Sequence, residues 1–145
     1  AAVIARVGEE RQFNPVMLLA RLQVEKSLIS TTTRPSQRRI DFAFGCGCHD
    51  GKACDESFRG FEAQLECAAE TLVVKYNDSF DGIGIWQEGV RKRTLDPIWV
   101  TPRSHATASM YAYTPWVLEG QGGNWLVWNV TRKFTKHLDD RGAFD

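Results

Sequence analysis

The chain has 145 residues, 43% of them hydrophobic and 25% charged, and its 18 Lys and Arg balance its 18 Asp and Glu. This composition excludes a disordered or fibrous chain, and the length predicts one globular domain over residues 1–145. With no net charge and a pI near 7.0, the chain lacks the uniform field that attracts nucleic acid, so we expect no nucleic-acid partner. The longest purely apolar run, residues 16–20, is far shorter than the roughly 18 residues of a membrane-spanning helix, so we expect no membrane span.

The N-terminal part of the chain predicts two helices. Apolar residues recurring on one side favour a short amphipathic helix over residues 2–13. Asn14 and Pro15 then form a start signal, because the Asn side chain can accept a free backbone N–H while proline occupies the first helical position. We therefore expect a second helix from Pro15 to about Leu28.

The second predicted helix carries a carboxyl group on its apolar face. Four residues follow one another at spacings of four, three and four, which is a single helical face: Leu18, Leu22, Glu25 and Ile29. Such a carboxyl is either satisfied by a partner or held in a partly dry pocket that raises its pKa, and the dry pocket makes a general acid usable near neutral pH. The alternative is a wider apolar stripe with Glu25 merely at its edge.

The middle of the chain predicts a small β element before a long helix. Residues 30–36 break the second helix, and the alternation over residues 39–43 is typical of a short strand, after which we expect a loop and a small hairpin. From Phe58 to about Val74, apolar residues recur at spacings of three and four and predict a long helix.

The C-terminal half predicts turns and two further helices. Turns are expected at residues 77–78 and 81–82, whereas residues 83–86 and 98–100 fit either short strands or extended loop. Thr101-Pro102 begins a helix that runs through Tyr113 and is ended by Pro115, and a last helix follows over residues 124–137. The predicted fold class is mainly α (α+β), with a small β element.

Four cysteines lie within 22 residues: Cys46, Cys48, Cys54 and Cys67. An even, clustered set in a small exported protein most often forms two disulfides. Because a direct Cys46–Cys48 bridge would be strained, we expect Cys54 and Cys67 each to take one of these two, with the pairing left open. The alternatives are free buried thiols, or a zinc site that includes His49, although zinc ligands usually come in pairs two to four residues apart. We expect no metal and no cofactor.

Several segments follow one another in a fixed order along the chain: Asn14–Leu19 with Leu22–Leu28, Phe44–Cys46 with Cys54-Asp55, Gly60–Leu65, and Tyr111–Pro115 with Asn124–Trp128. In this order they resemble a bacterial branch of the lysozyme-like superfamily, whose members cut peptidoglycan. The resemblance covers most of the chain, and residues 76–100 look like an insertion that shapes substrate choice. It implies a lysozyme-like helical domain with a small β element and a disulfide-stapled loop.

The resemblance also implies roles for individual residues. Glu25 would be the acid that protonates the glycosidic oxygen. Phe44 and Gly45 would match the glycine-containing segment that lines the cleft, and Tyr113 would match a tyrosine facing the glutamate. Thr114 follows this tyrosine where many relatives have Asn, and it is the remaining candidate for substrate binding.

A second departure concerns the residue after the glutamate. Transglycosylases typically have Ser directly after this glutamate, whereas here Lys26 follows Glu25. The resemblance therefore does not decide between a transglycosylase and a hydrolase.

A second carboxyl group would decide how the glycan is cut. Glycoside cleavage generally uses two carboxyl groups, and Asp41 is the best candidate for the second and for substrate binding, because it lies in the expected β element. Without it, the muramic acid 6-hydroxyl would attack, as in lytic transglycosylases, with the single glutamate acting first as acid and then as base. Hydrolysis, as in a true lysozyme or muramidase, is the equal alternative. If the acidic residues Asp41, Asp50, Asp55 and Glu56 line the cleft, they would favour deacetylated glycan.

We therefore expect a monomeric glycosidase or lytic transglycosylase that acts on peptidoglycan glycan strands at the MurNAc–GlcNAc β-1,4 bond. The chain opens with Ala1-Ala2-Val3, without an initiator Met or a signal segment, which favours a mature or trimmed domain that is secreted or periplasmic. The rival hypotheses are a non-catalytic cell-wall-binding module on the same fold, since fold alone never proves activity, and a zinc-stabilised adaptor built around residues 46–67.

Overall fold

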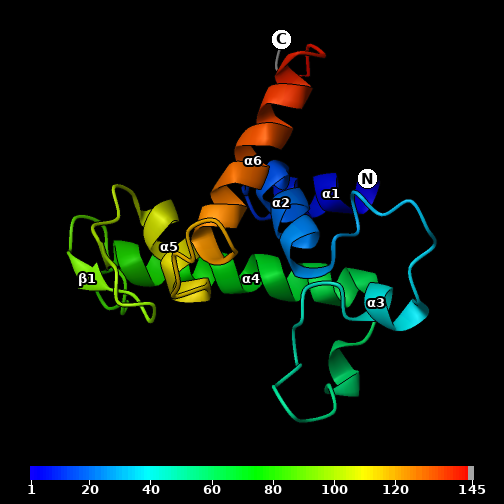
Figure 1. The fold of residues 1–145 in the computed structure, drawn as a ribbon, viewed down its shortest axis with the longest axis horizontal. Coiled ribbons are helices and arrows are strands. Elements are labelled where there is room, and N and C mark those ends of the chain that lie inside the picture. Colours follow the sequence, from blue (N-terminus) through cyan, green and yellow to red (C-terminus); the bar gives the residue numbers. More distant parts are fainter. Residues whose placement is uncertain (144–145) are drawn as a thin grey trace. The chain divides into compact units, whose positions relative to one another are not determined.

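The computed structural model describes residues 1–143, which form two compact units. Unit 1 comprises Ala1–Ala69 and Val130–Asp145, and unit 2 comprises Glu70–Asn129. Two long helices, α4 (Phe61–Phe80) and α6 (Gly123–Asp139), each have one part in either unit (Figure 1). One domain over residues 1–145 stays a prediction.

Unit 1 begins with the two expected helices, α1 (Ala2–Glu10) and α2 (Pro15–Lys26), which pack against each other. The predicted start of α2 is confirmed, because the Asn14 side chain accepts the backbone N–H of Val16 at 2.9 Å. The helix ends at Lys26 and is capped by Ser27, whose backbone is left-handed with φ 54°. Local signals at both ends of α2 therefore set its length.

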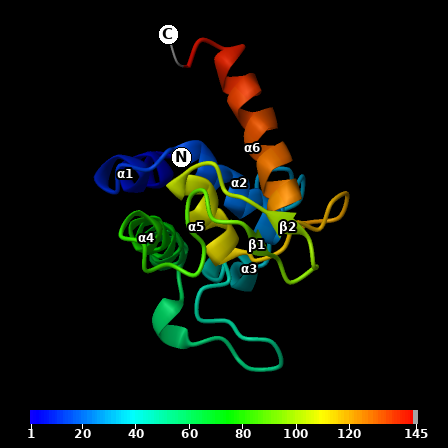
Figure 2. The same ribbon diagram turned by 90° about the vertical axis from the view of Figure 1, so that its left-hand side faces the viewer.

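An apolar core joins these helices to the first part of α4. It buries residues from α1, α2, the segment after α3 and α4: Ile4, Val7, Leu18, Leu22, Ala43, Phe44, Leu65, Ala68 and Ala69. Figure 2, turned by 90° from Figure 1, looks along α4 and shows α1 and α2 beside it. Because Phe44 is part of this core, the backbone that follows it starts from a fixed point.

The strand predicted over residues 39–43 is wrong. The chain forms instead a short helix, α3 (Gln37–Asp41), in which the Ser36 hydroxyl oxygen accepts the backbone N–H of Arg39 at 3.4 Å. The period-two alternation was a weaker signal than the helix start at Ser36. A serine that caps the first turn favours a helix more than two alternating apolar residues favour a strand. The expected hairpin is also wrong, since η1 (Glu56–Phe58), a single 3-10 turn, follows the loop.

The cysteines form two disulfides, Cys46–Cys67 and Cys48–Cys54. This confirms that Cys54 and Cys67 each bond to one member of the closely spaced pair. The zinc and free-thiol alternatives are wrong, because all four sulfur atoms are in disulfides. The Cys46–Cys67 disulfide fixes the loop after α3 to α4, and the Cys48–Cys54 disulfide closes a short loop within that segment.

Unit 2 begins within α4, which continues to Phe80 through the turn expected at residues 77–78. Lys75 forms an ion pair with Asp78 at 3.6 Å along this helix, and the chain turns only at Asp81-Gly82. The small sheet pairs β1 (Lys92–Arg93) antiparallel with β2 (Trp99–Val100). The β element therefore lies within residues 76–100 rather than at residues 39–43.

Helix α5 (His105–Tyr113) starts after a Ser104 cap, later than the expected Thr101-Pro102 start, and α6 follows. The described residues are mainly helical, and this confirms a mainly α fold. Within residues 1–143, every helix is too short or too polar to cross a membrane.

Candidate functional site

Glu25 lies in the last turn of α2, with its side chain 29% exposed. Its carboxylate forms an ion pair with the guanidinium of Arg21, one helical turn earlier. Of the three possibilities that the sequence left open, the structure therefore shows a carboxyl satisfied by a partner. Ile29, the last member of the predicted stripe, lies beyond the end of α2 and is 43% exposed.

Arg21 is a site residue that the sequence analysis missed. Its side chain is only 3% exposed, and a cation removed from water needs a compensating anion, which Glu25 supplies. The spacing of four residues between Arg21 and Glu25 was a usable signal, because residues at i and i+4 are neighbours on a helix. The pair holds the carboxylate in one direction.

Gly45 lies beside this carboxylate. Its φ is +75°, a left-handed conformation that favours glycine, and a Cβ built on it would be 4.0 Å from Glu25 Oε2. The structure thus brings together Glu25 and Gly45, which are 20 positions apart in the sequence. They meet in a loop after α3 rather than in the β region that we expected for Phe44-Gly45.

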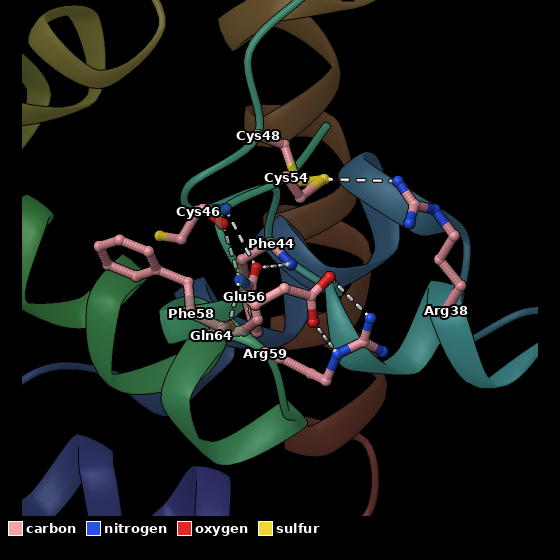
Figure 3. Close-up of a disulfide and its surroundings, with 9 residues drawn as sticks. All are labelled: Arg38, Phe44, Cys46, Cys48, Cys54, Glu56, Phe58, Arg59 and Gln64. Atoms are coloured by element: carbon pink, nitrogen blue, oxygen red, sulfur yellow. Dashed lines mark hydrogen bonds and ion pairs between the residues drawn. A yellow bond between two sulfur atoms is a disulfide. The ribbon is translucent and has the colours of Figure 1, made fainter. Parts of the chain in front are cut away.

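Gln64 of α4 holds this loop in place and was also missed (Figure 3). Its side-chain amide is fully buried and donates to the carbonyl oxygens of Cys46 and Phe58, each at 2.8 Å. Its Oε1 accepts the backbone N–H groups of Phe44 at 3.2 Å and Cys46 at 3.0 Å. These four bonds use the full hydrogen-bonding capacity of the amide. The sequence signal that could have identified Gln64 is a polar amide among the apolar positions of α4.

Asp41 does not lie in a β element, because it is the last residue of α3. It is nearly buried and accepts hydrogen bonds from Gln37 Nε2 at 2.9 Å and Arg59 Nη1 at 2.6 Å. The Gln37 bond and the Arg59 guanidinium lower its pKa. Its backbone oxygen also accepts the N–H of Gly60 at 2.9 Å. These contacts tie α3 to the start of α4 and support a structural role for Asp41.

Two further acids of the predicted acidic set have partners of their own. Glu56 forms an ion pair with Arg59, and this hydrogen bond lowers the pKa of Glu56 (Figure 3). Asp55 accepts the backbone N–H and hydroxyl of Ser57 at 2.9 and 2.8 Å, and these bonds lower its pKa. Because their charges are engaged within the chain, they give little support to a preference for amine-bearing glycan.

Tyr113 and Thr114 belong to unit 2. Tyr113 ends α5, and Thr114 donates its backbone N–H to the Met110 oxygen at 2.9 Å as the capping residue. The Thr114 carbonyl accepts Asn124 Nδ2 at 2.6 Å, which joins the end of α5 to the start of α6. That Tyr113 faces Glu25 stays a prediction.

Asp96 fixes the segment that follows Thr114, and nothing in the sequence pattern indicated it. Its carboxylate accepts the backbone N–H groups of Val117 at 3.0 Å and Leu118 at 2.7 Å. Burial alone would raise the pKa of Asp96, but the hydrogen bonds that it accepts outweigh burial and lower it. The carboxylate of Asp96 therefore holds residues 117–118 to the segment around Asp96 within unit 2.

Unit 2 also contains the residue types of a hydrolytic triad. Ser79 Oγ lies 3.0 Å from His105 Nδ1, and His105 Nε2 lies 2.9 Å from a carboxylate oxygen of Glu88. However, Ser79 is 3% exposed, and its oxygen also accepts the Glu88 N–H at 3.3 Å. A nucleophile must reach its substrate, so this chain of bonds supports a structural role.

Comparisons with protein-family models, with curated proteins and with solved structures found no match for this chain. The resemblance to lysozyme-like enzymes therefore depends on the sequence motifs alone. The geometry around Glu25 is the independent observation against which it can be judged.

Proposed function

We propose that this chain cleaves peptidoglycan glycan strands at the MurNAc–GlcNAc β-1,4 bond on a lysozyme-like fold, with Glu25 as the general acid. One observation carries the proposal. The Glu25 carboxylate, directed by Arg21, adjoins Gly45, a residue without a side chain in a loop held by Gln64 and by the Cys46–Cys67 disulfide. A positioned acid beside an open stretch of rigid backbone is what a sugar chain needs in order to approach a proton donor.

In the proposed reaction, Glu25 first takes up a proton from solvent, which breaks its ion pair with Arg21. It then gives this proton to the glycosidic oxygen as the C1–O bond breaks. The carboxylate that remains is stabilised by Arg21. Glu25 then accepts the proton of the muramic acid 6-hydroxyl while O6 bonds to C1, which forms an anhydro sugar without consuming water. The contacts of Asp41 with Gln37 and Arg59 favour this single-glutamate route over hydrolysis, which canonically uses a second carboxylate.

The two disulfides fit the proposed location. Disulfides form and persist in oxidising compartments, so a secreted or periplasmic bacterial protein is the proposal that agrees with them. Peptidoglycan is reached from the same side of the membrane.

The test is mass spectrometry of soluble products released from purified sacculi. We expect anhydro-muramic ends with the unmodified chain and their loss, by about a hundredfold or more, with Glu25→Gln. The matched control is Glu9→Gln, at an exposed position of α1, which should keep the activity. Reducing ends lost in the same variant would establish a muramidase instead.

A non-catalytic wall-binding module is the second candidate, because an Arg21–Glu25 pair also serves structure alone. It predicts that the unmodified chain sediments with sacculi and releases no product. That result would contradict the enzymatic proposal, and circular dichroism of both variants would show that each is folded.

A further inference from the structure

Unit 1 has a hollow of about 220 Å³ next to the end of α2, and three basic residues are among those that line it. Its lining consists of three cations, one hydroxyl, one aromatic ring and one disulfide: Lys26, Arg38, Arg39, Ser36, Phe42 and Cys48–Cys54. This lining contains no carboxylate. Lys26 directly follows Glu25, so the hollow begins one residue from the proposed acid.

The guanidinium groups of the hollow are held by neutral partners. Arg38 lies over the Phe42 ring, 5.5 Å from its centroid. Figure 3 shows its second contact, in which Arg38 Nη2 is 3.7 Å from Cys54 Sγ. Arg39 donates to the backbone oxygen of Lys26. These contacts orient the two side chains and pair neither guanidinium with a carboxylate, an arrangement that suits an anion site.

Acids near the hollow are engaged elsewhere. Within residues 1–143, none of the three cations forms an ion pair with a carboxylate, and the nearby Glu56 is paired with Arg59. Arg38 adds only a longer-range attraction that helps to lower the pKa of Glu56. Three cationic residues line the same hollow, and an oxyanion bound beside them would compensate their charge.

We propose that the hollow binds an oxyanion carried by the polymer that Glu25 cleaves, so that the inference rests on the proposed function. Guanidinium and ammonium groups recognise two such groups on cell-wall polymers: the carboxylates of stem peptides and the phosphates of attached polymers. The hollow also gives a role to Lys26, which stands where transglycosylases have Ser. A cationic site one residue from the acid selects anionic strands over deacetylated, amine-bearing ones.

The test measures binding by isothermal titration calorimetry at low salt, with both the unmodified chain and Glu25→Gln. The probes are a disaccharide-tetrapeptide muropeptide, the same compound with its carboxylates converted to amides, and a short glycerol-phosphate oligomer. We expect Arg38→Gln and Lys26→Gln each to weaken binding of the anionic probe by about five- to tenfold. The amidated compound should bind both variants and the unmodified chain equally. Binding of the muropeptide alone identifies stem carboxylates, and binding of the oligomer alone identifies phosphate.

The matched control is Arg34→Gln, which removes an exposed cation of the preceding loop that does not line the hollow. Arg38→Lys keeps the charge and should retain most of the binding, which guards against a misfolded Arg38→Gln. Equal weakening by Arg34→Gln and Arg38→Gln, or no binding of either anionic probe, overturns the inference. Binding is measured without turnover, so the two proposals can fail separately. If the unmodified chain cleaves sacculi but binds neither anionic probe, this inference alone is refuted. Anion binding without cleavage refutes the proposed enzyme.

Discussion

At the scale of single residues, a backbone conformation and a carboxylate meet at Gly45. The left-handed φ of +75° disfavours residues other than glycine, and a Cβ at this position would lie 4.0 Å from Glu25 Oε2. The same glycine therefore has two separable properties. One concerns stability and the other concerns access to the acid.

We predict that Gly45→Ala lowers the free energy of unfolding by about 1 kcal/mol and lowers product release far more than this loss explains. The added methyl group would lie 4.0 Å from Glu25 Oε2, in space that the proposed function needs for the sugar. Gly51 provides the control, since its φ is also +75° but a Cβ there meets nothing within 4 Å. Urea unfolding and product release are measured on both variants, and equal activity in the two would show that Gly45 matters only for its conformation.

At the scale of elements, the loop at the candidate site depends on α4. Gln64 satisfies two N–H groups and two carbonyl oxygens of backbone outside the helix, and the Cys46–Cys67 disulfide crosses from the loop to the next turn of α4. The disulfide limits how far the loop can move. The amide determines which conformation it keeps.

We predict that Gln64→Leu destabilises the protein by about 3 kcal/mol or more, because it leaves several buried backbone groups without hydrogen bonds. Amide hydrogen exchange should accelerate most at Phe44 and Cys46, while the core amides of α2 change less. The control is Gln121→Leu, at an exposed position, which should leave exchange unaltered. Unchanged exchange at Phe44 in Gln64→Leu would show that the disulfide alone fixes the loop.

The elements that the sequence predicted well are those with local signals. Asn14, the cap, and Pro15, the first helical residue, are neighbours that together determine the start of α2. Periodic apolar residues mark α4. The errors at α3 and at residues 77–78 came from weighing weak local patterns, two alternating residues and an Asn-Asp pair, against helical context. Tertiary packing overrides such propensities.

The same distinction applies to the site. Glu25 could be found from its place on a helical face. The possible disulfide pairings could be reduced because a direct Cys46–Cys48 bridge would be strained. The bonds of Gln64 could not be predicted, because their partners lie 6 to 20 positions away and are arranged by the folded loop. The meeting of Glu25 with Gly45 depends in the same way on packing across the core of unit 1.

At the scale of the whole molecule, acids and bases are equal in number, and several acids that have hydrogen-bond or ion-pair partners share a lowered pKa. Hydrogen bonds or ion pairs lower the pKa of Asp41, Asp55 and Glu56 in unit 1 and of Asp96 in unit 2. A carboxyl whose pKa is lower in the folded than in the unfolded chain adds stability at pH values above its unfolded pKa. That stability is lost as the pH falls through the folded pKa.

We therefore predict that the thermal midpoint is nearly constant around neutral pH and falls once the pH drops below the ordinary carboxyl values of 4.5 for Glu and 3.8 for Asp. Asp41→Asn and Asp96→Asn should each lower the midpoint at pH 7, and their difference from the unmodified chain should shrink on acidification, because protonation removes the same charges there. The control Asp50→Asn, at an exposed loop position, should follow the unmodified curve. Circular dichroism melts between pH 7 and pH 2 measure this, and a deficit of Asp41→Asn that is as large at pH 2 as at pH 7 would mean that its carboxyl acts through packing rather than through charge.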